Sequence, residues 1–85
     1  MVSQKVVITE SFGLHLRPAG KLCDTSLKFQ SKIELKKGTQ TANAKSVLGV
    51  LAARVQQGDE IELVCEGPDE QEALDAIVQL FKDGF

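Results

Sequence analysis

Apolar and polar residues alternate in three segments of the chain, residues 2–9, 31–36 and 60–66. Alternation over about four to eight residues is typical of a strand with one buried face. The buried faces are predicted to carry Val6, Ile8, Ile33, Leu35, Ile61, Leu63 and Cys65. Lys37-Gly38-Thr39 indicates a turn into a short polar strand that runs through Ala42, so these two strands form a hairpin.

Apolar residues recur at helical spacing in three other segments, residues 16–27, 46–53 and 70–82. Spacings of three and four residues place side chains on one side of a helix. The buried stripes of the first and last helices are predicted to be Ala19, Leu22, Cys23 and Ser26, and Ala73, Leu74, Ile77, Val78 and Phe81. Asp69-x-x-Glu72, directly after Pro68, predicts a capping box at the start of the last helix.

The order of these elements is strand, helix, strand, strand, helix, strand, helix. The hairpin requires antiparallel neighbours, and the helices must gather on one face of the sheet to bury their apolar stripes. The pattern therefore predicts an α+β open-faced sandwich and leaves the order of the strands open. No repeat, linker or change of composition interrupts the chain, which predicts a single domain over residues 1–85.

Length and charge restrict the classes of function. A chain of 85 residues buries one modest core and leaves little volume for the deep cleft of an enzyme. Its net charge of −2 does not attract nucleic acid or an acidic membrane, so no direct nucleic-acid partner is expected. No apolar run has the length of a signal-peptide core or a membrane span, so we expect a cytoplasmic protein without membrane insertion.

Cys23 and Cys65 are far apart in the sequence, and each lies on the apolar phase of its segment. This position is typical of reduced core cysteines, and a disulfide or redox role is the alternative. The chain has one histidine and no nearby cluster of cysteines or carboxylates, so neither a metal site nor a cofactor is expected.

The single histidine lies in Gly13-Leu14-His15-Leu16-Arg17-Pro18-Ala19, between a glycine turn and the first turn of a predicted helix. Proline fits a helix start, and arginine offers a planar cation that matches phosphate oxygens. The helix N-terminus, the arginine and the imidazole then converge on one anion. His15 is therefore a candidate phosphoryl acceptor, with the amides of Leu16 and Arg17 as candidate ligands of the transferred group. The alternative is that His15 is a surface residue that caps the helix.

These residues resemble the active-site signature of the HPr family, the histidine-containing phosphocarriers of the bacterial sugar phosphotransferase system. A second segment, Asn43-Ala44-Lys45-Ser46-Val47-Leu48-Gly49-Val50, resembles the regulatory serine segment of that family. The resemblance extends over the whole chain and includes Gly58, Gly67, Asp69, Glu70, Gln71 and Ala73. It implies a four-stranded antiparallel sheet covered on one face by three helices.

The resemblance also implies roles. His15 would accept a phosphoryl group on Nδ1 from phosphorylated enzyme I and pass it to sugar-specific enzyme IIA components, with Arg17 binding the group and Gly13 and Pro18 positioning it. Ser46 would be phosphorylated by HPr kinase/phosphorylase, and that form would slow transfer and serve as a corepressor for a catabolite-control transcription factor. The protein would be a monomeric carrier rather than an enzyme, because its partners catalyse the transfers.

Ser46 precedes an apolar run, where a hydroxyl caps a helix. The helix behind it is too short to bury apolar residues on more than one side, so part of it is expected to form a docking patch; the alternative is that all of them belong to the core. The expected patch consists of Leu16, Gly20, Asp24, Leu27, Val47, Leu48 and Leu51. A phosphate on Ser46 would place about two negative charges beside it.

Three residues depart from the family pattern. Phe12 replaces a small polar residue before Gly13, Asp24 replaces a neutral or basic residue, and Arg54 replaces the glycine that usually ends the second helix. Because glycine takes a positive φ at little cost, Arg54 predicts either a helix that continues past Ala53 or a loop of different shape near the histidine.

Two other functions stay open beside the phosphocarrier. A regulator of carbon catabolite repression that acts mainly through phosphoserine would not need His15 and Arg17, which are both present. A small stand-alone enzyme would need a second general acid or base near the histidine, and the neighbouring sequence offers none.

Overall fold

The computed structural model describes residues 1–9 and 13–85. Within them the elements are β1 (Val2–Val7), α1 (Leu16–Ser26), β2 (Lys32–Lys37), β3 (Gln40–Asn43), α2 (Val47–Ala52), β4 (Glu60–Glu66) and α3 (Glu70–Asp83). Every element predicted from the spacing of apolar residues is confirmed, with ends that differ by at most two residues. In this part of the chain no helix is long and apolar enough to cross a membrane.

The strands form one antiparallel sheet in the order β1-β4-β2-β3. β4 is central, because Leu63 lies opposite Gln4 of β1 and opposite Leu35 of β2. β2 and β3 are the predicted hairpin, and Gly38 in the turn between them has a φ of 58°.

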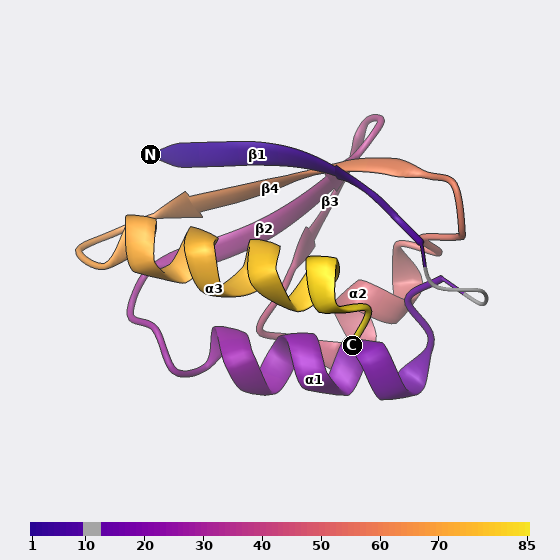
Figure 1. Cartoon of the computed structure of the whole chain (residues 1–85), viewed down its shortest axis with the longest axis horizontal. Coiled ribbons are helices and arrows are strands. Elements are labelled where there is room, and N and C mark those ends of the chain that lie inside the picture. The colour runs from indigo at the N-terminus through magenta and orange to yellow at the C-terminus, as the bar shows by residue number, and fades with distance from the viewer. Residues whose placement is uncertain (10–12) are drawn as a thin grey trace.

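The three helices cover one face of the sheet, as Figure 1 shows. α3 packs against β1 and β4, α2 packs against β3, and α1 packs against both of these helices. The core between the layers includes fully buried side chains from all of them, among them Leu22, Ile33, Leu35, Val50, Leu63 and Ile77. The predicted open-faced α+β sandwich is therefore confirmed.

The opposite face of the sheet is polar and pairs unlike charges across its strands. Lys5 of β1, Glu62 of β4 and Lys36 of β2 lie in one row of the register. Unlike charges directly opposite each other stabilise a sheet. Val64 breaks the predicted alternation, since it lies on this face and is nevertheless only 5% exposed.

The capping box predicted at the start of α3 is wrong. Asp69 is the N-cap residue, but its side chain makes no capping hydrogen bond. Its carboxylate instead accepts the backbone N–H groups of Gln30 at 3.0 Å and Ser31 at 2.9 Å, together with the Ser31 hydroxyl. These bonds, above all the one from the hydroxyl, lower the pKa of Asp69. The Asp69 carboxylate thus binds donors from a distant part of the chain in place of the N–H group of its own helix.

Cys23 and Cys65 are buried free thiols, as predicted. Burial, with smaller contributions from the charges of Glu70 and Asp69, raises the pKa of Cys65 to about 11. The Cys65 thiol therefore stays protonated at neutral pH, in keeping with a place in the core.

Candidate functional site

Gly13 holds the turn that leads into α1. Its φ is 68°, and a Cβ built on it would lie 2.2 Å from the Val55 carbonyl oxygen. The next residue, Leu14, is 4% exposed and donates its backbone N–H to the same oxygen at 3.0 Å. These contacts fix the backbone immediately before His15.

His15 is the N-cap residue of α1, with φ −87° and ψ −170°, and it is exposed. Its side chain makes no capping hydrogen bond, so the alternative in which the imidazole caps the helix is wrong. The helical ladder begins where the Ala19 N–H donates to the His15 carbonyl at 2.9 Å. The N–H groups of Leu16 and Arg17 precede that bond, and groups in this position are suited to bind an anion.

The imidazole faces a shallow hollow at the start of α1. Its lining consists of His15, Arg17, Pro18, Gly84 and Phe85, and its volume is about 210 Å³. The lining thus comes from the start of α1 and from the two residues that follow α3. Figure 1 shows the reason: the end of α3 lies beside the N-terminal half of α1. The hollow is large enough for a small anion and lies below the range of about 300 to 1,000 Å³ that is typical of small-molecule sites.

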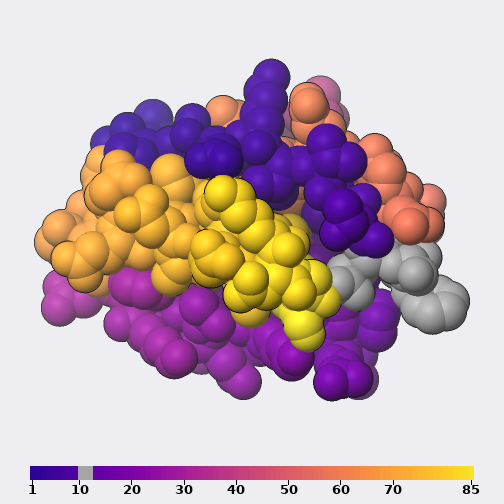
Figure 2. Space-filling model, viewed as in Figure 1, coloured from indigo at the N-terminus to yellow at the C-terminus, as the bar shows by residue number. Residues whose placement is uncertain are grey.

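Residue 85 is held by one contact with α1 and one with α3. Lys21 Nζ donates to the Phe85 backbone oxygen at 2.7 Å, and the ring of Phe85 meets that of Phe81 edge to face with centroids 4.9 Å apart. In the space-filling view the yellow residues of this end cover part of the molecule's surface above α1 (Figure 2). Sequence reasoning missed Gly84 and Phe85, since nothing local connects them to a helix that lies 64 residues earlier.

The electrostatics of this end of α1 favour an anion. Arg17 and Lys21 are both exposed, and the first turn of α1 contains no acidic residue. The positive end of the helix dipole adds to their attraction. Among the described residues there is no group of three or more His, Cys, Asp or Glu side chains that could hold a metal ion.

Ser46 lies at a second helix start on the same layer. It is the N-cap residue of α2, and its hydroxyl accepts the Gly49 N–H at 3.1 Å, which confirms the predicted cap. The Cys23 thiol donates to the Lys45 carbonyl at 3.1 Å and thereby fixes this segment against the C-terminal half of α1. Eight residues separate Cys23 from His15, which is about 12 Å at about 1.5 Å per helical residue. Ser46 and the imidazole therefore share a layer without touching.

α2 runs antiparallel to α1. It begins beside Cys23, and the chain that leaves it reaches Leu14 through Val55. The two helices thus form one surface that extends from His15 to Ser46. We call this surface the α1–α2 patch and define it by the residues predicted for docking, which are Leu16, Gly20, Asp24, Leu27, Val47, Leu48 and Leu51.

The exposed apolar part of the α1–α2 patch is narrower than predicted. Leu16, Leu27 and Leu48 are 69%, 60% and 79% exposed. Val47 and Leu51 are less exposed than predicted, because both are half-buried and pack against the core. Although α2 has only six residues, these two side chains lie partly in the core beside the buried Val50. Asp24 is exposed within the patch, as expected for a charged side chain.

The helix does not continue past Ala53, so that expectation for Arg54 is wrong. α2 ends at Ala52, Ala53 is its C-cap residue, and Arg54 itself takes a φ of 52°. The arginine therefore adopts the conformation in which glycine was expected. Phe12, the third departure from the family pattern, lies outside the described residues.

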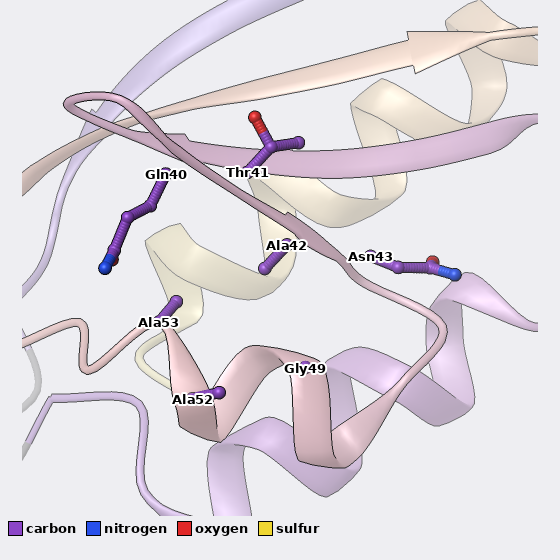
Figure 3. Close-up of a pocket in the computed structure, with 7 residues that line it drawn as sticks. All are labelled: Gln40, Thr41, Ala42, Asn43, Gly49, Ala52 and Ala53. Atoms are coloured by element: carbon purple, nitrogen blue, oxygen red, sulfur yellow. The ribbon is translucent and has the colours of Figure 1, made fainter.

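A second hollow, of about 350 Å³, lies between β3 and α2 (Figure 3). Small and neutral residues line it, namely Gln40, Thr41, Ala42, Asn43, Gly49, Ala52 and Ala53. None of these side chains titrates near neutral pH, so the hollow offers no general acid or base. The candidate chemistry is at His15, although the hollow there is smaller.

Comparison with known proteins agrees with this geometry. A family model described as the PTS HPr component phosphorylation site matches residues 2–83. The phosphocarrier protein HPr of Treponema pallidum (strain Nichols) is 45% identical over 85 residues, covering 100% of this chain and 97% of that protein. The crystal structure of HPr-C-His from Thermoanaerobacter tengcongensis superposes with a TM-score of 0.96 at 39% identity, covering 100% of this chain and 96% of that one.

A third relative is linked to catabolite repression. The crystal structure of the Bacillus subtilis catabolite repression protein Crh, described as a dimer with a swapping domain, has a TM-score of 0.79 at 36% identity. The two chains cover 99% and 97% of each other.

The fold and these matches define the class as small phosphocarrier proteins of the phosphotransferase system, which carry a phosphoryl group and are not enzymes in themselves. Within that class, the chain belongs to the HPr family. The resemblance seen in the sequence is thereby confirmed.

Proposed function

We propose that His15 carries the phosphoryl group, accepting it from phosphorylated enzyme I and passing it to enzyme IIA components. The observation that supports this most directly is an exposed imidazole at the head of α1, lining a hollow of about 210 Å³ together with Arg17. An exposed acceptor can be reached by two partner proteins in turn. The hollow admits the transferred group and little else.

The transfer is a displacement at phosphorus. A ring nitrogen of His15 donates its electron pair, a P–N bond forms, and the bond between phosphorus and the donor atom of enzyme I breaks with its electron pair leaving on the donor. The other ring nitrogen keeps its proton. Arg17 binds two phosphoryl oxygens with its planar fork, and the N–H groups of Leu16 and Arg17 bind from the helix start. Gly13 positions the ring through the fixed turn before it, and Pro18 through its buried place in the first turn of α1.

The partners dock on the α1–α2 patch in this proposal. Leu16, Leu27 and Leu48 are large apolar side chains that water surrounds in the isolated chain. Apolar groups gathered beside a reactive residue are typical of a protein interface, whose centre they occupy while charged residues form its rim. Enzyme I and enzyme IIA would therefore use the same surface at different times.

Ser46 is the regulatory site in this proposal, phosphorylated by HPr kinase/phosphorylase. The added phosphate carries about two negative charges and stands beside Leu48, at a helix start that lies next to Cys23 rather than next to the imidazole. It therefore opposes docking more than it disturbs the ring. The same form would serve as a corepressor for a catabolite-control transcription factor, and the similarity to Crh supports that part.

Residues 1–85 act as one cytoplasmic domain and as a monomer in this proposal. All three helices and all four strands contribute to one core, which supports a single folding unit. A patch used for two different partners must stay accessible, which supports the monomer. Sedimentation of the chain at working concentration checks this, and a stable dimer would contradict it.

Phosphorylation by enzyme I tests the central claim. The parent, His15→Ala and Ser46→Ala are incubated with enzyme I and phosphoenolpyruvate, and intact mass is read before and after mild acid. We expect one acid-labile phosphoryl group on the parent and on Ser46→Ala, and none on His15→Ala. Acid-labile phosphate on His15→Ala would overturn the assignment. A parallel incubation with HPr kinase/phosphorylase tests the alternative. Acid-stable phosphate from that incubation as the parent's only modification would favour the phosphoserine-dependent regulator.

A further inference from the structure

Arg54 holds a backbone conformation that disfavours any residue with a Cβ. Its φ is 52°, a value that it shares, among the described residues other than glycine, only with Phe85 at 57°. Crowding between Cβ and the backbone makes this region costly for arginine and free of cost for glycine. The chain thus keeps an exposed arginine where glycine would be more stable.

The surroundings fix this conformation without help from the arginine side chain. Lys37 Nζ donates to the Arg54 carbonyl at 2.8 Å and forms an ion pair with Asp59 at 3.0 Å. The following carbonyl, that of Val55, accepts the Leu14 N–H at 3.0 Å. Strained residues persist where neighbours over-determine them, and they cluster at functional sites. Because these backbone contacts do not involve the arginine side chain, a function for that side chain is to be sought in what it can bind.

The place of Arg54 relates it to His15. The hydrogen bond between Leu14 and Val55 joins the two loops. His15 directly follows Leu14, and Arg54 directly precedes Val55. Arg54 does not line the hollow with His15 and Arg17. Within residues 1–9 and 13–85 its guanidinium forms no ion pair. Arg54 directly follows Ala53, the C-cap residue of α2, and so lies at this end of the α1–α2 patch, outside the hollow that would hold the transferred group.

Charge indicates what this end of the patch binds. Although the chain has a net charge of −2, α1 and α2 with their caps and the residue next to each cap carry one acidic residue, Asp24, against the cations Arg17, Lys21, Lys28, Lys45 and Arg54. The rest of the chain carries the acidic excess. A cationic rim around apolar residues is complementary to a partner with carboxylates around its own apolar surface.

We propose that Arg54 is a specificity-determining residue that binds a carboxylate of the phosphoryl-donor protein when that protein docks on the α1–α2 patch. This inference rests on the proposed function, with enzyme I as the donor. The planar guanidinium fork matches a carboxylate with two hydrogen bonds, which an ammonium group cannot reproduce. The phosphoryl group itself is bound by Arg17, which lines the hollow.

Kinetics of transfer from phosphorylated enzyme I test the inference. The variants are Arg54→Gly, which removes the strain and the charge, Arg54→Asn, which removes the charge with a residue that tolerates this φ, and Arg54→Lys, which keeps the charge alone. Lys36→Gln is the matched control, because it removes one exposed cation from the opposite face of the sheet. Phosphoramidate, a small phosphoryl donor, is the probe for transfer to His15 without a docking partner. Thermal melting reports folding.

We expect Arg54→Gly and Arg54→Asn to raise KM for the chain about three- to tenfold at unchanged kcat, with Arg54→Lys in between and Lys36→Gln unchanged. Arg54→Gly should melt at a higher temperature than the parent, and the KM effect should shrink with added salt. The rate with phosphoramidate should be equal in all variants. Equal KM values for Arg54→Gly and Lys36→Gln would overturn the inference.

Two further outcomes are informative. A matching loss of rate with phosphoramidate would place Arg54 on the phosphoryl group and overturn the inference about the partner's carboxylate. A parent that takes a phosphoryl group from neither donor would overturn the proposed function, and this inference with it. Phosphorylation of the parent therefore distinguishes failure of the proposed function from failure of the inference about Arg54.

Discussion

Gly13 lies against Val55 so closely that a Cβ on residue 13 would be 2.2 Å from the Val55 carbonyl oxygen. The φ of Gly13, 68°, is a second reason why no other residue fits. Gly13→Ala must therefore strain its backbone and push the two loops apart. We expect it to lower the free energy of unfolding by more than about 2 kcal/mol, measured with urea, and to slow phosphoryl transfer to His15.

Gly38→Ala is the matched control for that variant. Gly38 has a similar φ, 58°, but a Cβ there would have no atom within 4 Å. It should lose only the conformational part, about 1 kcal/mol, and transfer should proceed at the parent rate. If both variants lose the same free energy, the contact with Val55 is not what requires glycine at position 13.

Arg17 is predicted to act through the shape of its guanidinium as well as its charge. Arg17→Ala should lower kcat/KM for transfer from enzyme I about ten- to a hundredfold, the value of a charge-assisted pair of hydrogen bonds. Arg17→Lys should recover part of this, since an ammonium group keeps the charge without the fork. Lys21→Ala removes a cation four residues along the same helix and should cost much less. Equal rates for the alanine and lysine variants of Arg17 would show that it does not bind the group.

The elements of this fold follow from local patterns, and this is why the sequence predicted them well. Alternation marked β4, and spacings of three and four residues marked α1 and α3, because each side chain is placed by its own element. His15 and Ser46 were found as helix starts for the same reason. The apolar face of a short helix was harder: Val47 and Leu51 turn partly inward because the core, rather than α2, decides what is covered.

Contacts between distant parts of the chain could not be predicted in the same way. The position of β4 between β1 and β2 depends on which edges pair, and the hydrophobic period is the same for every order. Phe85 reaches the start of α1 through Lys21. The carboxylate of Asp69 was predicted to cap its own helix, yet it accepts hydrogen bonds from Ser31. The local and the distant donor can each satisfy this carboxylate, and the packing of the folded chain determines which of them does.

The bond between Asp69 and Ser31 predicts how stability depends on pH. Hydrogen bonds from Ser31 and Gln30 lower the pKa of Asp69 in the folded state. A carboxyl with a depressed folded pKa contributes stability that is present above its unfolded value, near 3.8, and is lost as pH falls through the folded value. Urea midpoints of the parent should therefore fall below about pH 4, and those of Asp69→Asn should start lower and fall less.

Glu72→Ala separates this network from the capping box expected from the sequence. Glu72 would be the second member of such a box, and removing it would then destabilise the start of α3. Since Asp69 makes no capping bond, Glu72→Ala should have nearly the parent's urea midpoint at every pH. A loss as large as that of Asp69→Asn would mean that the box forms in solution.

The last prediction concerns Ser46, where a charge is expected to weaken docking while the fold stays intact. The hydroxyl accepts the Gly49 N–H at 3.1 Å, and Asp or Asn caps a helix as well as Ser does. Ser46→Asp should gain a few tenths to about 1 kcal/mol from the helix dipole. It should raise KM for transfer from enzyme I, because the charge lies beside Leu48 of the α1–α2 patch.

Ser46→Asn decides whether that effect comes from charge, since it keeps the cap and adds a side chain of the same size without the carboxylate. It should have the parent's KM, whereas Ser46→Ala should lose about 1 kcal/mol of stability with the cap and also keep the parent's KM. Amide chemical shifts of Ser46→Asp should change only around α2 and the facing turns of α1. Changes throughout the sheet would indicate a conformational mechanism, and an unchanged affinity for enzyme I would place Ser46 outside the docking surface.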